Sequence, residues 1–180
     1  MQNEVTKPEF CNALAQLASG VSIITTAFHG QMRGITATAV NSVTADPPTV
    51  LVCTNSSTGT SKMIADAGWF AVNFLAAGQR AVSDVFAGMG GLQGDDRFGF
   101  GDWETSGPNR LPLLTGALAQ LECEVEKMVK SGTHDVYFGH VRSVKVSPGE
   151  PLIYHGGNYL PHAPFVDKNR ETVGVRTMSG

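Results

Sequence analysis

The chain has 180 residues, with 13 Lys+Arg against 16 Asp+Glu and a formal net charge of -3. That length is typical of one domain, so we expect a single domain over 1–180, with a core over about 10–160 and a tail or arm over 161–180. The slight acidic surplus excludes duplex nucleic acid as the main partner, and a hydrophobic content of 42% excludes a disordered chain.

The first predicted element is a helix that begins after Thr6. Thr6 and Glu9 form a capping box, and apolar residues then recur at helical spacing from Phe10 to Leu17. Gly20 ends the pattern. The apolar stripe predicts that this helix packs against the body of the protein.

Three strands are expected next, as a meander. The β-branched run 21–28 is typical of a strand, and a tight turn at 29–30 returns the chain as a second strand over 33–44. The prolines at 47–48 cannot donate to a strand ladder, so they predict a turn before a third strand over 49–54.

The middle of the chain mixes short helices with one strand. A polar loop over 55–61 leads into a short helix that ends at Gly68, and a strand over 69–75 precedes a second short helix over 79–86. The segment 88–107 holds seven of the 21 glycines, and we expect it to be an irregular, flexible lid.

Two long strands, over 118–129 and 134–146, and a short one over 151–155 complete the prediction. Charged residues alternate along the first of these strands, which indicates one solvated face. Most strands follow one another without βαβ units, so six or seven strands with two or three peripheral helices predict a mainly β fold, an antiparallel barrel.

Several kinds of site are excluded by spacing. Gly88, Gly90 and Gly94 lie one residue off the dinucleotide fingerprint and do not open a helix inside a βαβ unit. The histidines lack metal-ligand spacing, so we expect no metal site. The odd, scattered cysteines indicate reduced, buried thiols. No export signal or membrane-spanning run is visible, which predicts a cytoplasmic protein with no membrane partner.

Two segments could hold a ligand. The hydroxyl-rich loop 55–62 enters a helix with Lys62 in its first turn, which fits either a bound phosphate or an ordinary capped surface helix. The strand 36–42 consists of small and hydroxyl-bearing residues that would let a flat ligand approach the backbone. On pattern alone, a strand crossing a crowded barrel interior explains it better.

Five segments, taken in order, carry a family resemblance. They are 20–26 (GVSIITT), 34–48 (GITATAVNSVTADPP), 50–53 (VLVC), 70–75 (FAVNFL) and 132–139 (GTHDVYFG). Over about residues 10–160 the chain resembles the flavin reductases that serve two-component flavin monooxygenases.

The resemblance implies an antiparallel Greek-key split β-barrel with peripheral α-helices that forms a homodimer. It implies an NAD(P)H-dependent flavin reductase (EC 1.5.1) that uses FMN or FAD with NADH or NADPH. Reduced flavin would pass to a separate oxygenase that acts on an aromatic compound. The alternatives are a split-barrel flavin- or haem-binding protein without reductase activity, and a flavoenzyme that keeps its flavin and acts on its own substrate.

The resemblance also implies the site residues. Those lining the flavin ring and ribityl chain are Thr36, Ala37, Thr38, Ala39, Asn41 and Ser42, with Cys53, Thr54 and Asn55 flanking the ring. Those meeting the phosphate are Ser61 and Lys62. A loop over the site, 95–98, contributes Arg97 and Phe98, and the residues nearest the nicotinamide are His134 and Tyr154.

Overall fold

The structure, a computed structural model, describes residues 4–160, and the tail expected over 161–180 lies outside the described residues. It is mainly β, and all strand pairs are antiparallel, as the sequence predicts. Seven strands form the main sheet in the order β3-β2-β6-β9-β10-β5-β4. Their bounds are β2 Ser22–Phe28, β3 Gln31–Ala37, β4 Val40–Ala45, β5 Pro48–Asn55, β6 Trp69–Phe74, β9 Ala119–Ser131 and β10 His134–Val146.

The strand expected over 33–44 is two strands, and the meander is wrong. The chain leaves β3 after Ala37 and re-enters a strand at Val40. β3 pairs with β2, whereas β4 pairs with β5, so these consecutive strands lie at opposite ends of the sheet order. Thr38 and Ala39 lie between the two strands, and there the chain passes from pairing with β2 to pairing with β5. The end of β3 next to this break lines the groove described below.

Two further sheets were not predicted, although one of their strands, β11, falls within the short strand expected over 151–155. One is a hairpin of β7 (Trp103–Ser106) and β8 (Leu111–Leu114), and the other joins β1 (Ser19–Gly20), β11 (Ile153–His155) and β12 (Asn158–Tyr159). β1 and β12 have two residues each, too few for an alternating pattern, and the hairpin begins inside the glycine-rich segment that predicts a loop.

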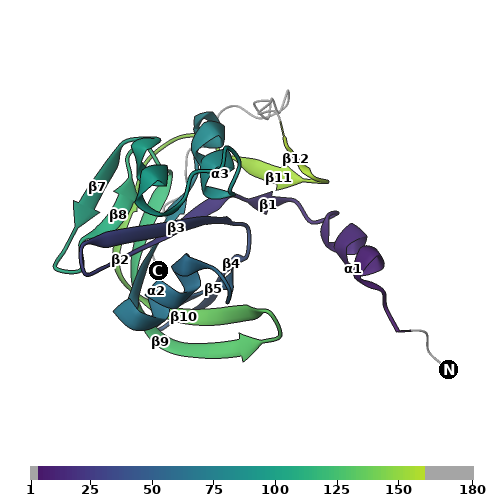
Figure 1. Ribbon diagram of the computed structural model, residues 1–180, viewed down its shortest axis with the longest axis horizontal. Helices are drawn as coiled ribbons and strands as arrows, with labels where there is room; N and C mark the ends of the chain where they lie inside the picture. The colour runs from purple at the N-terminus through teal and green to yellow at the C-terminus, as the bar shows by residue number, and fades with distance from the viewer. Residues whose placement is uncertain (1–3, 161–180) are drawn as a thin grey trace, which may run out of the picture.

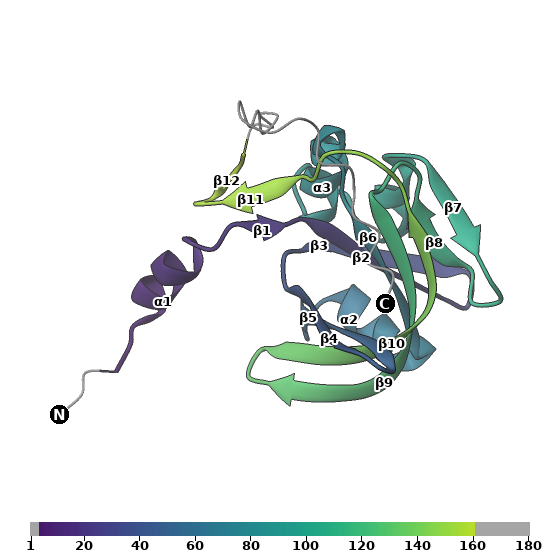
Figure 2. The ribbon, with the colours of Figure 1, turned by 180° about the vertical axis from the view of Figure 1, so that it is seen from behind.

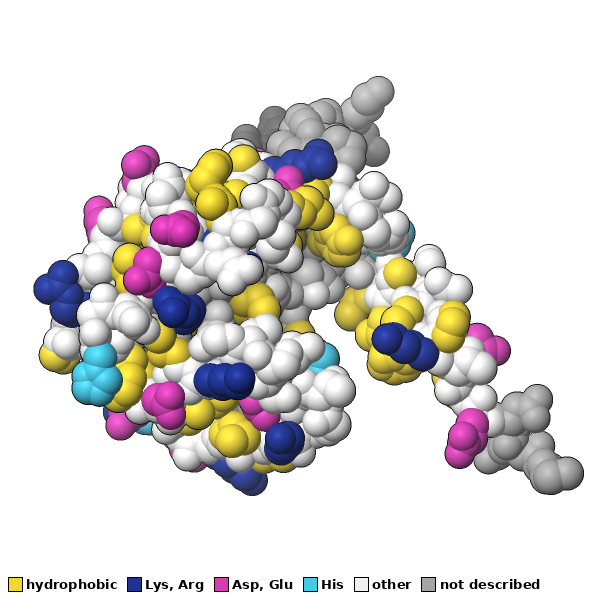
Figure 3. All heavy atoms as spheres, in the orientation of Figure 1, with side chains coloured by type: hydrophobic (Ala, Val, Ile, Leu, Met, Phe, Trp, Pro, Cys, Tyr) yellow, Lys and Arg dark blue, Asp and Glu magenta, His cyan; other side chains and the backbone are white. Residues whose placement is uncertain are grey.

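The first helix, α1 (Lys7–Leu14), has the capping box expected at Thr6 and Glu9, but its expected packing is wrong. None of its residues is buried, and the helix projects from the body in both ribbon views (Figures 1 and 2). Phe10 is 58% exposed, Leu14 51% and Leu17 64%. The space-filling view shows hydrophobic side chains, coloured yellow, on the surface of the projecting arm (Figure 3).

The other two helices lie where the sequence predicts them, and both pack on the main sheet. α2 (Gly59–Ala67) ends at Gly68, whose φ of 70° is the left-handed cap that glycine favours. A short 3₁₀ turn, η1 (Ala77–Gln79), leads into α3 (Arg80–Phe86). Phe86 of α3 is fully buried, and the close approach of β3 at Gly34 leaves no room for a Cβ, which would lie 2.6 Å from the Phe86 ring.

The segment 88–107 is irregular, as expected, but it is attached to the body. It contains a 3₁₀ segment, η2 (Gly94–Gly99), whose Phe98 packs edge-on against Phe86 with ring centroids 5.1 Å apart. The ring centroid of Trp103 lies 5.0 Å from that of Phe98 in the same aromatic cluster. These contacts hold the segment against β3 and α3.

Candidate functional site

A groove follows β3 along its contact with α3. Thr36 Oγ1 donates a hydrogen bond to the Ser83 carbonyl oxygen at 2.7 Å, which fixes α3 beside the strand. One cavity of about 310 Å³ is lined by Thr36, Ala37 and Thr38, and a second of about 560 Å³ is lined by Arg33, Gly34 and Ile35. Both cavities are lined by residues of β3 and reach Ala87, so they lie next to one another along this strand, and together they are called the groove below.

One end of the groove is cationic. Arg33 and Arg97 line it together with Thr58, Gly59 and Thr60 at the start of α2. Thr58 caps the helix by accepting from the Ser61 backbone N–H, and the first turn of α2 holds no acidic residue. Free N–H groups at a helix N-terminus and two guanidinium groups form a site for an anion such as a phosphate.

The charge of Arg97 has no carboxylate partner in the described part of the chain. Its guanidinium donates to the carbonyl oxygens of Leu92, Gly34 and Phe86 at 2.9, 3.4 and 3.3 Å. Arg33 is paired with Asp95, with Nη1 and Oδ1 2.9 Å apart. The cationic end therefore keeps a net positive charge.

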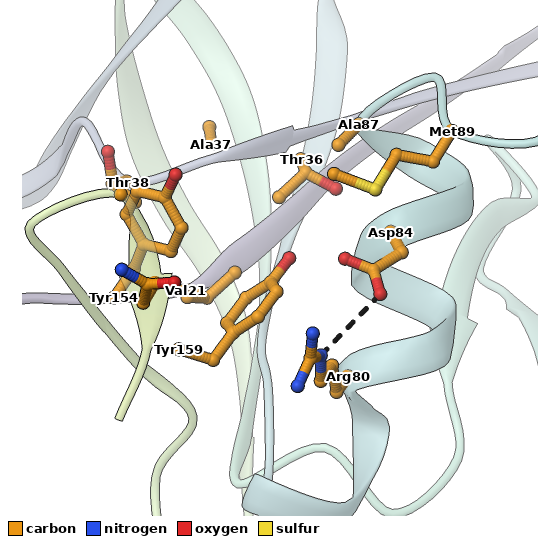
Figure 4. A pocket seen from close by; sticks show the side chains of 12 residues that line it. Val21, Thr36, Ala37, Thr38, Arg80, Asp84, Ala87, Met89, Tyr154 and Tyr159 are labelled. Atoms are coloured by element: carbon orange, nitrogen blue, oxygen red, sulfur yellow. Dashed lines mark ion pairs between the residues drawn. The ribbon is translucent and has the colours of Figure 1, made fainter. Parts of the chain in front are cut away.

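The other end of the groove is aromatic (Figure 4). Tyr154 of β11 and Tyr159 of β12 meet edge-on, with ring centroids 5.3 Å apart. The Tyr159 hydroxyl is 2.9 Å from Ser83 Oγ, and Arg80 Cζ lies 5.0 Å from the Tyr159 ring. Burial raises the pKa of Tyr159, and the nearby Asp84 carboxylate adds to the rise, so this phenol stays protonated.

The groove brings together five of the residues expected at the site: Thr36, Ala37, Thr38, Arg97 and Tyr154. Arg33, which was not expected, completes the cationic end. Its only signal in the sequence is one charged residue in a strand of small and apolar ones.

Two expected residues lie in the interior instead. Ser61 is fully buried and donates to Asp135 Oδ2 at 2.7 Å, while Thr54 Oγ1 donates to Ser61 Oγ at 2.9 Å. Tyr137 donates to the Ser61 carbonyl oxygen at 2.7 Å. The Ser61 and Thr54 hydroxyls thus attach α2 to the sheet.

Phe98 is a third expected residue with an interior position. It is 9% exposed and belongs to the aromatic cluster below the groove. Lys62, by contrast, is exposed on α2 and is not among the residues that line the two cavities.

A second group of expected residues lies on β4, β5 and β10, outside the two cavities that form the groove. These residues are Asn41, Ser42, Cys53, Asn55 and His134, with Ala39 just before β4. His134 is opposite Asn55 in the β10–β5 register, and Cys53 donates its backbone N–H to the Ala39 carbonyl oxygen. The Asn55 side chain accepts from Ser57, which shapes the loop before α2.

The cysteines differ from the buried set expected. Cys123 is buried, Cys53 is half-buried and Cys11 is exposed on α1. Burial raises the pKa of Cys53, and burial with the neighbouring Glu122 raises that of Cys123 to about 12. Both are therefore neutral thiols at pH 7 and poor nucleophiles.

Within residues 4–160, no three His, Cys, Asp or Glu side chains gather as a metal site requires. The same range contains no helix long and apolar enough to span a bilayer.

Comparison with known proteins adds to this geometry. Residues 14–162 match the model of the flavin reductase like domain. The chain is 39% identical over 156 residues to FMN reductase (NADH) RutF of Ancylobacter novellus, covering 86% of this chain and 84% of that one. It is also 39% identical over 162 residues to the 4-hydroxyphenylacetate 3-monooxygenase reductase component of Salmonella typhimurium, covering 89% and 95%. The NADH:FAD oxidoreductase SgcE6 of Streptomyces globisporus superposes with a TM-score of 0.80 at 28% identity, covering 91% of this chain and 100% of that one.

Proposed function

This chain belongs to the flavin reductase like domain family, and we propose on that basis that it is an NAD(P)H-dependent flavin reductase of EC class 1.5.1. It transfers a hydride from NADH to FMN or FAD, and the reduced flavin serves a separate monooxygenase. The name of the relative from Ancylobacter novellus supports NADH as the donor and FMN as an acceptor.

The observation that carries the proposal is the groove along β3, with its cationic and aromatic ends. Arg33, Arg97 and the start of α2 fit the phosphate of a flavin nucleotide. The small side chains of Thr36 and Ala37 leave the strand open to a flat ring. The residues present therefore fit a flavin nucleotide whose phosphate lies at the Arg33 end.

The bound flavin supplies the acceptor for the hydride, which carries two electrons from the nicotinamide ring. The protein binds the phosphate through Arg33 and Arg97 and orients the ring against β3. Tyr154 and Tyr159 form the wall that holds the nicotinamide ring of NADH in contact with the flavin ring. Holding two rings together is the proximity effect, and the transfer needs no general base.

Release of reduced flavin is the second part of the proposal. The relative from Salmonella typhimurium is named as the reductase component of a monooxygenase that acts on an aromatic acid, which supports an aromatic substrate for the partner enzyme here. A groove open at the surface, with its phosphate held by side chains and backbone N–H groups, suits a flavin that binds and leaves.

We also propose a homodimer of single-domain, split-barrel protomers. α1 has eight residues, fewer than an isolated helix needs for stability in water, and it buries none of them in its own chain. A second copy would cover its apolar side chains. Exposed apolar residues also occur on β4, β9 and β10, namely Val43, Met128, Val129, Val144 and Val146. In such a dimer, Asn41, Cys53 and His134 would meet the flavin site from the second copy.

Steady-state assays with the four pairs of FMN or FAD and NADH or NADPH test this function. The proposal expects nicotinamide oxidation that depends on added flavin and is fastest with NADH. Tight flavin binding without turnover would instead favour a flavin-binding protein with no reductase activity.

A further inference from the structure

A separate cavity, called the turn cavity below, lies where two hairpin turns meet. Its volume is about 460 Å³, and it shares no lining residue with the two cavities of the groove. One wall is the turn between β2 and β3, and another is the turn between β7 and β8. Both turns lie at the end of the body opposite α1 in the two ribbon views (Figures 1 and 2).

Each of these turns contributes a residue with an unusual backbone conformation. His29 in the first turn and Arg110 in the second both have a φ of 49°, and they are the two non-glycine residues with positive φ among residues 4–160. Glycine or asparagine adopts this conformation at lower cost, so the turns alone do not explain a histidine and an arginine there. Both residues line the turn cavity. Backbone strain of this kind clusters at ligand sites, so the cavity is a candidate for one.

The charge of the turn cavity comes from Arg110. Its guanidinium has no ion pair or hydrogen bond within the described residues, and no Asp or Glu of that range lines the cavity. The end of α2 reaches the cavity at Ala67, where the helix carbonyl groups are partly negative. They amount to about half an elementary charge, against a whole one on the guanidinium. The cavity therefore favours an anion.

Aromatic rings form much of the remaining lining. The rings of Phe28 and His29 are tilted against each other with centroids 4.0 Å apart, and Trp69 lies half-buried in the same lining. Phe28 is 36% exposed, so its ring is accessible to a ligand. Such rings pack well against another flat ring. The Asn109 side chain, also in the lining, adds an amide donor next to the Arg110 guanidinium in sequence.

We propose that the turn cavity binds a small aromatic carboxylate. The carboxylate pairs with the Arg110 guanidinium, which can donate two parallel hydrogen bonds to it, and the ring packs against Phe28 and Trp69. The site is distinct from the groove, because the groove meets the start of α2 and the turn cavity meets its end. It does not depend on the proposed reductase activity.

Benzoate is the probe for this site, with benzyl alcohol as a matched ring without charge and acetate as a carboxylate without a ring. Isothermal titration calorimetry measures the affinities, with and without saturating FMN. We expect benzoate to bind at least about tenfold more tightly than either control compound, and equally well when FMN is present. In a Trp103→Phe variant, Trp69 is the one remaining tryptophan, and benzoate should change its fluorescence.

Arg110→Asn is the decisive variant, because asparagine tolerates positive φ and the protein should remain folded with no loss in thermal stability. It should weaken benzoate about tenfold or more and leave FMN binding unchanged. Arg142→Asn, which removes an exposed arginine outside the cavity, is the matched control. No saturable binding of benzoate, its displacement by FMN, or equal affinities in the wild type and Arg110→Asn would overturn the proposal.

Discussion

Replacing Ser61 with alanine removes the hydroxyl that joins α2 to the sheet. In the wild type, Thr54 donates to Ser61 Oγ at 2.9 Å, and Ser61 donates to Asp135 Oδ2 at 2.7 Å. The variant leaves the Thr54 hydroxyl without its acceptor and this Asp135 oxygen without its donor. Asp135 is 8% exposed, so water cannot fully replace the lost bond.

The expected loss of stability follows from those two hydrogen bonds. A hydrogen bond to a charged group contributes about 1.5–3 kcal/mol and a neutral one about 0.5–1.5 kcal/mol, so the free energy of unfolding should fall by about 2–4 kcal/mol. A loss of about 3 kcal/mol lowers Tm by about 6–12 °C in a domain of this size. Urea and thermal unfolding measure the loss, and fluorescence titration with FMN and riboflavin measures binding below the melting range.

Ser57→Ala is the control, because the same substitution there removes a hydroxyl that is exposed in the loop before α2. It should change the free energy of unfolding by no more than about 0.5 kcal/mol. An interior role for Ser61 predicts that its variant keeps the wild-type ratio of FMN to riboflavin affinity. Unchanged stability with a selective loss of FMN would refute the reasoning and return Ser61 to the phosphate site.

Four further results are expected. Arg33→Ala should weaken FMN binding about 10–100-fold and riboflavin binding little, as measured by fluorescence titration. Arg142→Ala, which removes an arginine outside the groove, is the control. Equal losses of affinity for both flavins would show that Arg33 does not bind the phosphate. Gly139→Ala should lower the free energy of unfolding by about 1–3 kcal/mol, because the new Cβ would overlap the Phe70 ring. Gly78→Ala is the control, because its new Cβ meets open space and should leave the stability unchanged. Similar urea midpoints for the two variants would contradict the packing. Leu14→Ser should shift the protein from dimer to monomer in sedimentation without lowering the stability of the monomer, and an unchanged dimer would show that α1 does not form the interface. His134→Ala should raise KM for NADH with little change in flavin affinity, and a loss of flavin affinity instead would place His134 against the flavin or in a structural role.

The sequence predicts the larger elements because their signals are local. The capping box at Thr6, the prolines before β5 and the glycine after α2 each act within a few residues of where they stand. The packing of α1 could not be predicted in the same way. An apolar stripe shows that a helix face must be covered, but not whether its own chain covers it.

The positions of some expected site residues follow from local pattern, whereas others depend on how the interior packs. Thr36–Thr38 line the groove because they lie at the end of β3 and just after it, where the sequence predicts a strand of small residues. Arg33 was not expected in the groove, because its place there depends on the approach of α2 and η2 to β3, which no local pattern specifies. Ser61 has the residue type of a phosphate ligand, yet the helix turns its hydroxyl towards Asp135.

Anaerobic mixing of a small amount of the protein with NADH and a large molar excess of free FMN or FAD tests the central claim most directly. We expect the visible flavin absorbance to be lost through many turnovers, with one NADH oxidised for each flavin reduced. No loss of absorbance, or a loss limited to one flavin per protein chain, would contradict a reductase that releases its reduced flavin.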